Sequence, residues 1–465
     1  MNMTQLIGTL VCIAVMVWLF VMDRDAREPA SKALWIPTVW LLIIGSRAVS
    51  TWLHLSPAVS LAQQYTEGSP LDAAVYGILI AGGALVLNFR SCQVKRFMQR
   101  NLPLLLFFVY CALSIAWSDY SFIALKRWSK SVGDLVMIMV VLTDPYPLAA
   151  VKRLLARATF VLLPLSVLLI KCYPDLGSAF NPGDMTTMYF GVTTFKNMLG
   201  MISMVFGLAS LWSFMNAYLE RTMPRRKEHL IAHGVMIGTA MWLIVTADSM
   251  TSLGCFVIAG SVMVLISQRW VARRRSSVHV IVWTAIVAPV VVLLIDTFGT
   301  LVHSLGRNAT LTGRTTIWKA VLSLHTNPLV GRGFESFWLG NRLEAVWNMS
   351  VQGIQEAHNG YIELYLNLGW IGLLLLGWLI VTGYRDAIAA FRSDPREGRL
   401  RLAFLTAALI FSLTEAGFRM LTPVWFAFLL AVAGCSCGLH PEEQKGIPGS
   451  FWMRASDQKQ IRILQ

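Results

Sequence analysis

The chain has 465 residues, of which 56% are hydrophobic and only 14% are charged, and its formal net charge is +14. This composition is too apolar for a soluble protein of that length and excludes the soluble globular class. A net positive charge would fit a nucleic-acid-binding protein, but no nucleic-acid-binding motif accompanies it.

Apolar runs of about 20 residues, the length that crosses a bilayer, recur along the whole chain. We expect helical spans at 4–22, 33–50, 71–89, 102–117, 130–143, 158–171, 198–216, 230–247, 251–267, 278–296, 361–383, 401–417 and 421–436. The fifth and sixth are short, so tilting, merging with a neighbour or lying partly in the interface are alternatives for them. The predicted fold is all-α: a polytopic integral membrane protein with 12 or 13 transmembrane helices and one long extracytoplasmic loop.

The basic residues alternate between loops in a way that predicts orientation. The loops at 23–32, 90–100, 144–157, 217–229, 268–277 and 384–401, with the tail after 437, hold 27 of the 39 Lys and Arg residues. The positive-inside rule assigns these segments to the cytoplasm. The N-terminus is therefore expected outside and the C-terminus inside.

One outside segment is much longer than the others. We divide the chain into transmembrane helices 1–10 (1–296), a long periplasmic loop with the catalytic motifs (297–360), the C-terminal transmembrane helices (361–436) and a cytoplasmic tail (437–465). Loops of this length are more often functional than passive.

Within the long loop, TLTGRTTIWKAVLSLHTNPLVGRGFESFW predicts a short surface helix. Thr315 or Thr316 is the expected cap of a helix over about 317–325, which the following Asn-Pro ends. The turn formed by Gly331, Arg332 and Gly333 is expected to present its backbone N–H groups outward.

Arg314 stands at the predicted start of that helix, where the macrodipole disfavours a cation by a few tenths to about 1 kcal/mol. An anion held there by free N–H groups and the guanidinium would explain the placement. A structural salt bridge, for instance to Glu335, is the alternative.

His358 lies just before a long apolar run, where water gives way to hydrocarbon. An unperturbed imidazole is partly neutral near pH 7, so it can accept a proton from a hydroxyl group. Glu356 and Asn359 are placed to orient it or a substrate. The alternative is an interfacial histidine hydrogen-bonded to a helix cap.

Other cations also fall on the outer side, among them Lys196 and the triplet Lys126, Arg127 and Lys130, which shares one helical face. For the triplet, contact with lipid phosphates is the alternative to substrate binding. The chain has no P-loop, no HExxH, no GxSxG and no GxGxxG. The cysteines show no metal spacing, and few carboxylates fall inside spans, which disfavours a cation-coupled transporter.

One stretch of the long loop, GRTTIWKAVLSLHTNPLVGRGFESFW, and the stretch EAHNGYIELYLNLGWIGL, which runs from the end of the loop into the next span, resemble the C-terminal signature of the O-antigen ligase and polymerase superfamily. Two earlier stretches, SIAWSDYSFIALKRWSKSVGDL and FGVTTFKNMLGMISMV, are similar to its exopolysaccharide branch. The resemblance runs over roughly 105–380 with the pieces in the expected order.

The resemblance implies a metal-independent glycosyltransferase on the outer face of the bacterial inner membrane, with no cofactor. Its donor would be an oligosaccharide on undecaprenyl pyrophosphate and its acceptor another saccharide, within the lipid bilayer and alongside other polysaccharide assembly proteins, without nucleic acid. Arg314 would then bind pyrophosphate and His358 would be the base.

The remaining expected substrate contacts are Lys196, Arg127, Lys130, Arg332, Asn359 and Glu356. Many members of the family carry an arginine at the outer start of a middle helix, where this chain reads Asp248-Ser249-Met250-Thr251-Ser252. We therefore expect Lys196 or Arg127 to supply the missing charge.

The predicted function is polymerisation of lipid-linked repeat units into a surface polysaccharide or exopolysaccharide. A ligase that moves finished chains to lipid A core or to a protein uses the same donor chemistry and is the first alternative. A carrier that moves the lipid-linked saccharide across the membrane, and a non-catalytic scaffold, are alternatives from other classes.

Overall fold

The computed structural model describes residues 2–23, 30–55, 68–181, 185–297, 310–324, 326–349 and 353–434. Its first elements are α1 (Met3–Met22), η1 (Lys32–Leu34), α2 (Trp35–Ile44), α3 (Val49–Trp52), α5 (Pro70–Phe89), α6 (Ser91–Arg100), α7 (Leu102–Leu113), η2 (Ser114–Trp117), α8 (Ser121–Leu142), α9 (Pro147–Cys172) and α10 (Pro174–Gly177). Then follow β1 (Ser178–Asn181), β2 (Thr186–Tyr189), α11 (Lys196–Leu219), α12 (Arg226–Thr246), α13 (Met250–Ile266), α14 (Arg269–Arg273) and α15 (Arg275–Thr297). The last are α16 (Thr310–Ser323), α17 (Asn341–Met349), α18 (Gly360–Ser393), α19 (Pro395–Thr414) and α20 (Pro423–Val432).

The all-α prediction is confirmed, because the strands in the described ranges form only one small antiparallel hairpin, β1 with β2. Every apolar run predicted to span the membrane falls on a helix. Proline in the first turn helps to set several of these starts, since it needs no N–H partner there. Helices α5, α7, α9, α19 and α20 begin in this way.

Length and apolarity alone qualify 7 of the described helices as spans, or up to 8 if α6 and α7 with η2, bent by 88°, count as one. The shorter apolar helices are Lys32–Ile44, Met250–Ile266 and Pro423–Val432. The multi-pass architecture is therefore confirmed, while the count of 12 or 13 spans stays a prediction. The fifth and sixth predicted runs fall on the long helices α8 and α9. The runs looked short because charged residues of the same helices precede them in the sequence.

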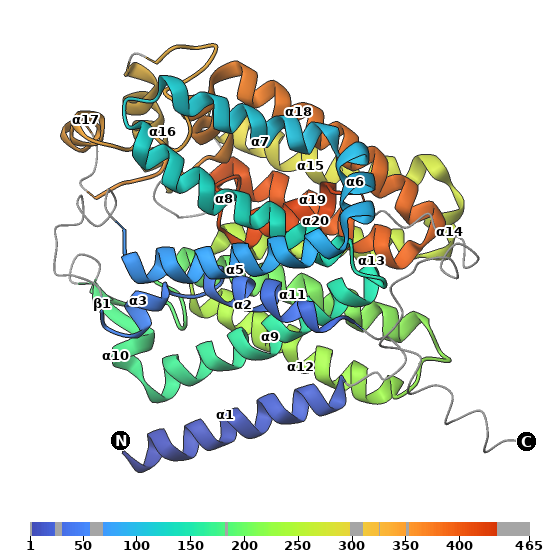
Figure 1. Ribbon diagram of the computed structural model, residues 1–465. Helices are drawn as coiled ribbons and strands as arrows, with labels where there is room; N and C mark the ends of the chain where they lie inside the picture. Colours follow the sequence, from blue (N-terminus) through green and yellow to red (C-terminus); the bar gives the residue numbers. More distant parts are fainter. Residues whose placement is uncertain are drawn as a thin grey trace, which may run out of the picture.

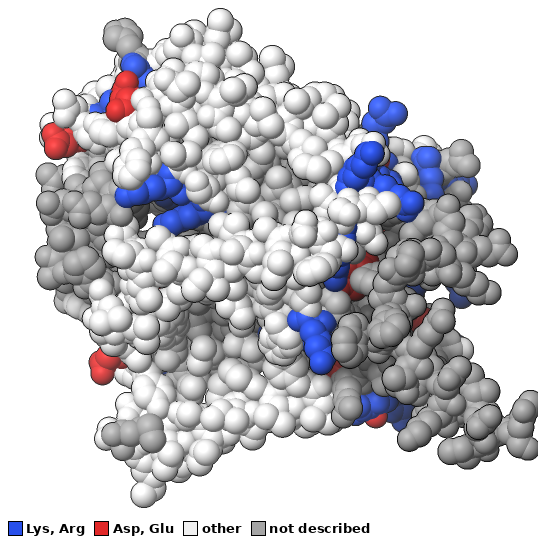
Figure 2. Space-filling model, viewed as in Figure 1, with Lys and Arg blue, Asp and Glu red and all other residues white. Residues whose placement is uncertain are grey.

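The long helices run roughly parallel across Figure 1, with α1 along the lower edge and α7 and α18 along the upper edge. The N-terminus, α16 and α17 lie at the left end, and α6 and α14 lie toward the right. Basic residues gather at the right end in Figure 2, as expected if that end faces the cytoplasm. We call the left end, which holds α16 and α17, the outer end.

Two predicted boundaries are wrong at this outer end. Helix α16 begins at Thr310, so Thr315 and Thr316 lie within the helix and do not cap it. Helix α19 ends at Thr414 and α20 begins only at Pro423, so the intervening segment 415–422 is not part of either span.

A buried carboxylate holds segment 415–422 in place. Asp134 of α8, which is fully buried, accepts hydrogen bonds from the Trp40 indole at 2.8 Å and from the Leu421 backbone N–H at 2.9 Å. Gly133 leaves room for this contact, because a Cβ there would meet the Trp40 ring at 2.0 Å. Leu421 has a φ of +61°, a strained value that its surroundings must enforce. The segment is therefore anchored from the membrane core.

Candidate active site

Asn359 fixes the start of α18. Its side-chain oxygen accepts hydrogen bonds from the backbone N–H groups of Tyr361 and Ile362, each at 3.0 Å. Its amide nitrogen donates to the carbonyl oxygen of Leu413 at 3.0 Å, near the end of α19. Asn359 is thus a helix cap that also joins the ends of two helices. This geometry favours a positioning role over the substrate contact predicted from sequence.

The residue before His358 is held from two sides. The backbone carbonyl oxygen of Ala357 accepts a hydrogen bond from the Trp318 indole of α16 at 2.8 Å. The backbone N–H of Ala357 donates to the Glu363 carboxylate at 3.0 Å. His358 itself has a φ of +47°, a conformation that costs a non-glycine residue roughly 1–3 kcal/mol. The neighbouring hydrogen bonds hold the strained backbone and fix the direction of the imidazole.

Two carboxylates converge on the imidazole. Nδ1 of His358 lies 3.1 Å from Oε1 of Glu356 and 3.2 Å from Oε2 of Glu415. Burial acts to lower the pKa of His358, but hydrogen bonds and charge attraction from both carboxylates dominate and raise it to about 10. Burial likewise acts to raise the pKa of Glu356, yet His358 and Arg419 hold it below its usual value. The two carboxylates therefore favour the protonated imidazole near pH 7, whereas the sequence alone predicts an unperturbed, partly neutral one.

Arg314 and Arg419 complete the cluster with positive charge. Nη2 of Arg314 lies 2.8 Å from Oε1 of Glu415, and Nη1 of Arg419 lies 3.5 Å from Oε2 of Glu356. The predicted alternative partner of Arg314, Glu335, is not the one found. Arg314 also lies beyond the first turn of α16, so it does not share that helix N-terminus with an anion. The ion pair with Glu415, which also contacts His358, holds the Arg314 guanidinium beside the imidazole.

We name these five residues, Arg314, Glu356, His358, Glu415 and Arg419, the outer charge cluster. Glu356, His358 and Glu415 lie close enough to hold a metal ion between them. The two arginines already neutralise the same carboxylates, and a protonated imidazole has no lone pair for a metal at Nδ1. The arrangement therefore suits an anionic ligand better than a cation.

The N-terminal end of α11 reaches the same cluster. The Asn197 amide nitrogen lies 3.3 Å from Oε1 of Glu415, and the ammonium of Lys196 lies 3.5 Å from Oδ2 of Asp248. Asp248 is the first residue of the stretch 248–252, where many family members carry an arginine and this chain does not. The ammonium of Lys196, from the start of α11, lies beside this stretch, as expected if Lys196 supplies the missing charge.

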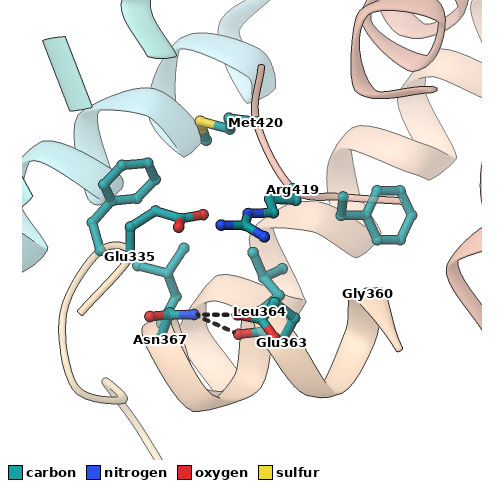
Figure 3. Close-up of a pocket in the computed structure, with 10 residues that line it drawn as sticks. Glu335, Gly360, Glu363, Leu364, Asn367, Arg419 and Met420 are labelled. Atoms are coloured by element: carbon teal, nitrogen blue, oxygen red, sulfur yellow. Dashed lines mark hydrogen bonds between the residues drawn. The ribbon is translucent and has the colours of Figure 1, made fainter. Parts of the chain in front are cut away.

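The other predicted cations lie apart from His358. Arg127 pairs with Glu335, its Nη1 being 3.9 Å from Oε2 and also donating to the Glu335 backbone carbonyl. Figure 3 shows the Glu335 carboxylate and the Arg419 guanidinium facing each other across a small pocket beside α18. Arg127 thus contacts a residue that lines the same small pocket as Arg419. Lys130 faces α5, with its ammonium 5.7 Å from the centre of the Tyr76 ring.

The glycine turn that follows α16 does not present free N–H groups, which corrects the sequence prediction. The N–H of Gly331 donates to Asn327 at 2.9 Å, that of Arg332 to Leu366 at 3.1 Å and that of Gly333 to Asn367 at 2.8 Å. The turn therefore packs on the first part of α18 through its backbone.

Helix α18 is itself interrupted to receive this turn. Gly369 has non-helical torsion angles, φ +63° and ψ −163°, and the N–H groups of Trp370 and Ile371 donate to Pro328 and Leu329 at 2.9 and 3.1 Å. A Cβ at Gly369 would lie 2.3 Å from the Leu329 carbonyl oxygen. The Asn-Pro-Leu-Val-Gly-Arg-Gly motif is thus explained by docking against α18, and no binding role for Arg332 follows from it.

Sequence reasoning missed Glu415 and Arg419. Glu415 falls in the end of the span predicted at 401–417, and Arg419 falls in the three-residue gap before the span predicted at 421–436. The available signal was a pair of charges, four residues apart, at a break between two apolar runs on the outer side. Charges at such a mouth are costly unless they are paired or functional.

Two comparisons bear on these observations. Residues 234–377 match the family model described as O-antigen ligase. The chain is also similar to the exopolysaccharide production protein ExoQ of Rhizobium meliloti (strain 1021), with 24% identity over 328 residues, which cover 68% of this chain and 72% of the relative. The matched region includes α16, the glycine turn and His358.

Proposed function

We propose that the chain polymerises undecaprenyl-pyrophosphate-linked repeat units into an exopolysaccharide or surface polysaccharide, as its similarity to the O-antigen ligase family and to an exopolysaccharide production protein supports. The family implies a glycosyl-transferring membrane enzyme with lipid-linked saccharide substrates. The similarity to a protein named for exopolysaccharide production supports an exopolysaccharide as the product. We further propose that the reaction takes place on the outer face of the bacterial inner membrane. The observation that carries the proposal is the outer charge cluster.

The reaction joins one saccharide hydroxyl to the anomeric carbon of the donor. The hydroxyl oxygen forms a bond to that carbon, and the bond from carbon to the pyrophosphate oxygen breaks. The electron pair of the broken bond leaves with undecaprenyl pyrophosphate, and the hydroxyl proton passes to a base on the protein. Activation comes with the donor, so no nucleotide is needed.

Arg314 is the proposed principal contact for the leaving group. Negative charge grows on the bridging oxygen as the bond breaks, and fixed cationic donors stabilise it by about 2.7–4 kcal/mol each. Arg419 and Lys196 are proposed to assist from either side of the cluster. Nη2 of Arg314 lies 2.8 Å from Oε1 of Glu415, and the remaining N–H donors of the guanidinium are proposed to bind phosphate oxygens.

His358 is proposed to act in its charged form. With a pKa raised to about 10, the imidazole carries its proton throughout the neutral range and donates charge and a hydrogen bond to the donor. Glu356 is then the proposed base, because its side chain is 29% exposed and Glu415 is only 7% exposed. A carboxylate plays the same part in inverting glycosidases.

The test is the size profile of undecaprenyl-linked glycans in a strain lacking this protein. Accumulation of single repeat units on the outer face is expected for a polymerase. Long lipid-linked chains would instead identify a ligase, and single units confined to the inner face would identify a carrier. An unchanged profile would exclude all three.

Variants then test the cluster. Complementation with Arg314→Ala or His358→Ala is expected to abolish long chains while the protein remains abundant in the membrane. One matched control is Arg342→Ala, which removes another arginine of the long loop, one that pairs with Asp119. The other is His54→Ala, which removes an exposed histidine at the outer end. Normal polymer from Arg314→Ala would remove that residue from the mechanism.

A further inference from the structure

A second cluster of metal-ligating side chains lies at the opposite end of the membrane domain. His229 and His233 are four residues apart on α12, near its N-terminal end, and Asp23 is the C-cap of α1. A helix of 20 residues spans about 30 Å, so Asp23 is separated from the outer end by the full length of α1. Nothing in the proposed glycosyl transfer uses these three residues.

The three side chains converge on one point. Nδ1 of His229 lies 2.8 Å from Oδ1 of Asp23, and Nε2 of His233 lies 3.0 Å from the same oxygen. Residues i and i+4 lie on the same face of a helix, which brings both rings to the α1 side. Their planes differ by only 6°, with ring centres 6.5 Å apart. One ligand atom from each residue lies within 4.8 Å of the other two.

Burial makes these polar groups costly without a strong partner. Each imidazole is 2% exposed and the Asp23 side chain is 13% exposed. The second ring nitrogens, Nε2 of His229 and Nδ1 of His233, have no hydrogen-bond partner in the described part of the chain. Around them lie Phe160 of α9, with its ring 5.5 Å from that of His233, and Met236 of α12.

We propose that Asp23, His229 and His233 bind a divalent transition-metal ion, Zn²⁺ in the first instance, at the cytoplasmic end of α1. Two histidines and one carboxylate are a known zinc ligand set, usually completed by a water molecule. Tetrahedral ligands about 2.0–2.1 Å from the metal lie roughly 3.3 Å from one another. Each distance between an imidazole nitrogen and the Asp23 oxygen would therefore lengthen by about 0.3–0.5 Å on metal binding.

The outer charge cluster serves as the internal comparison. There the carboxylates are already paired with Arg314 and Arg419, whereas the recorded partners of Asp23 are two imidazoles, which can be neutral ligands. A buried carboxylate with two histidines attracts a cation, and a cluster that contains two guanidinium groups repels one. The metal is thus assigned to the inner end and the anion to the outer end.

The site would fasten α1 to the bundle. Most of the α1 surface is exposed, with Cys12 and Leu19 as its buried residues. Within a bilayer an apolar face gives little preference for packing against another helix over lipid, so polar links carry much of the association. A metal shared by α1 and α12 is such a link, and its loss would free α1.

The test uses the full-length protein in detergent, purified through a histidine-free tag, stripped with a chelator and titrated with Co²⁺ and then Zn²⁺. The wild-type protein is expected to bind one Co²⁺ with a tetrahedral absorption spectrum, to lose that spectrum when Zn²⁺ displaces it, and to gain thermal stability. His229→Ala and His233→Ala are expected to weaken binding by more than about 100-fold, beyond the usual effect of an outer-shell residue.

Asp23→Asn keeps the size and hydrogen bonding of the side chain but removes its charge, so it tests the site if the histidine variants fail to fold. It is expected to bind Co²⁺ more weakly than the wild type. His358→Ala and His279→Ala, which lie outside the cluster, are the controls and should retain full binding. Absence of stoichiometric Co²⁺ in the wild-type protein, or loss of binding in His358→Ala alone, would overturn the proposal.

Discussion

Replacing Glu415 by glutamine is expected to lower the pKa of His358 and to leave the imidazole neutral over part of the accessible pH range. In the wild-type protein, Glu356 and Glu415 together outweigh burial and raise the pKa of His358 to about 10. Glutamine keeps the size of the Glu415 side chain and an oxygen for Arg314. It removes one of the two negative charges that hold the proton on His358.

The size of the effect follows from the two contacts. The carboxylates lie at nearly equal distances, 3.1 and 3.2 Å, so each accounts for a substantial part of the rise. An opposite charge at this range shifts a pKa by about 1–3 units, or about 1–4 kcal/mol of preference for the charged form. The pKa of His358 in Glu415→Gln should therefore fall by about 1–3 units.

The sign for stability is fixed by the same shift. Because the folded-state pKa of His358 is raised above the usual value of 6.5, the charged imidazole stabilises the fold fully below about pH 6.5. That contribution is lost as the pH rises to about 10. Glu415→Gln should show a smaller loss over this interval, completed at a lower pH.

Carbethoxylation provides an assay that does not depend on activity, because diethyl pyrocarbonate acylates the neutral imidazole. The modification rate at His358, followed by peptide mass spectrometry across the pH range, reports its neutral fraction. The exposed His54 on the same molecule serves as the reactivity reference, and Glu335→Gln is the matched carboxylate control. Equal His358 titration curves in the wild type and Glu415→Gln, or a wild-type midpoint near 6.5, would refute the reasoning.

Four further outcomes are expected. Arg314→Lys keeps a charge but loses the planar fork, so turnover in proteoliposomes should fall between that of the wild type and that of Arg314→Ala, the latter about 10²–10³-fold down. Asn359→Ala should cost about 1 kcal/mol of stability through the lost cap, read as a lower thermal midpoint. Asn359→Asp keeps the cap acceptor but loses the donor to Leu413, so it should restore the midpoint only in part. Gly369→Ala should reduce the yield of folded protein in fluorescence-detected size exclusion, whereas Gly377→Ala, with open space around it, should not. Lys196→Ala should raise KM for the lipid-linked donor more than it lowers kcat, and Lys196→Arg should recover most of the loss.

The helices were predictable because the bilayer imposes their length. In hydrocarbon, an apolar run such as 361–383 can form all its backbone hydrogen bonds only as a helix, whatever its neighbours are. The ends were harder to place, since only the charges of Glu415 and Arg419 interrupt the apolar sequence there. In the structure the backbone of Glu415 is already extended, and its carboxylate contacts Arg314 and His358.

The residues of the site were predictable as types, but their partners were not. Arg314 and Glu415 are 101 positions apart, and no local pattern links them. The motif residues around Arg332 looked like a phosphate loop because glycine turns often expose N–H groups. Here two of those N–H groups donate hydrogen bonds to carbonyl oxygens of α18 just before its break at Gly369. A helix interruption of this kind has no sequence signal beyond the glycine.

The charge balance of the outer charge cluster would explain why the proposed anion site contains two carboxylates. If Arg314 moves to the pyrophosphate, Glu415 loses a guanidinium but retains the proton-bearing imidazole of His358 at 3.2 Å. Likewise Glu356 keeps His358 when Arg419 turns away. Leaving a buried charge unpaired costs about 3–5 kcal/mol, which would oppose donor binding. A His358 that keeps its proton near neutral pH lowers that cost, so the same geometry that raises its pKa would also let Arg314 bind the proposed donor.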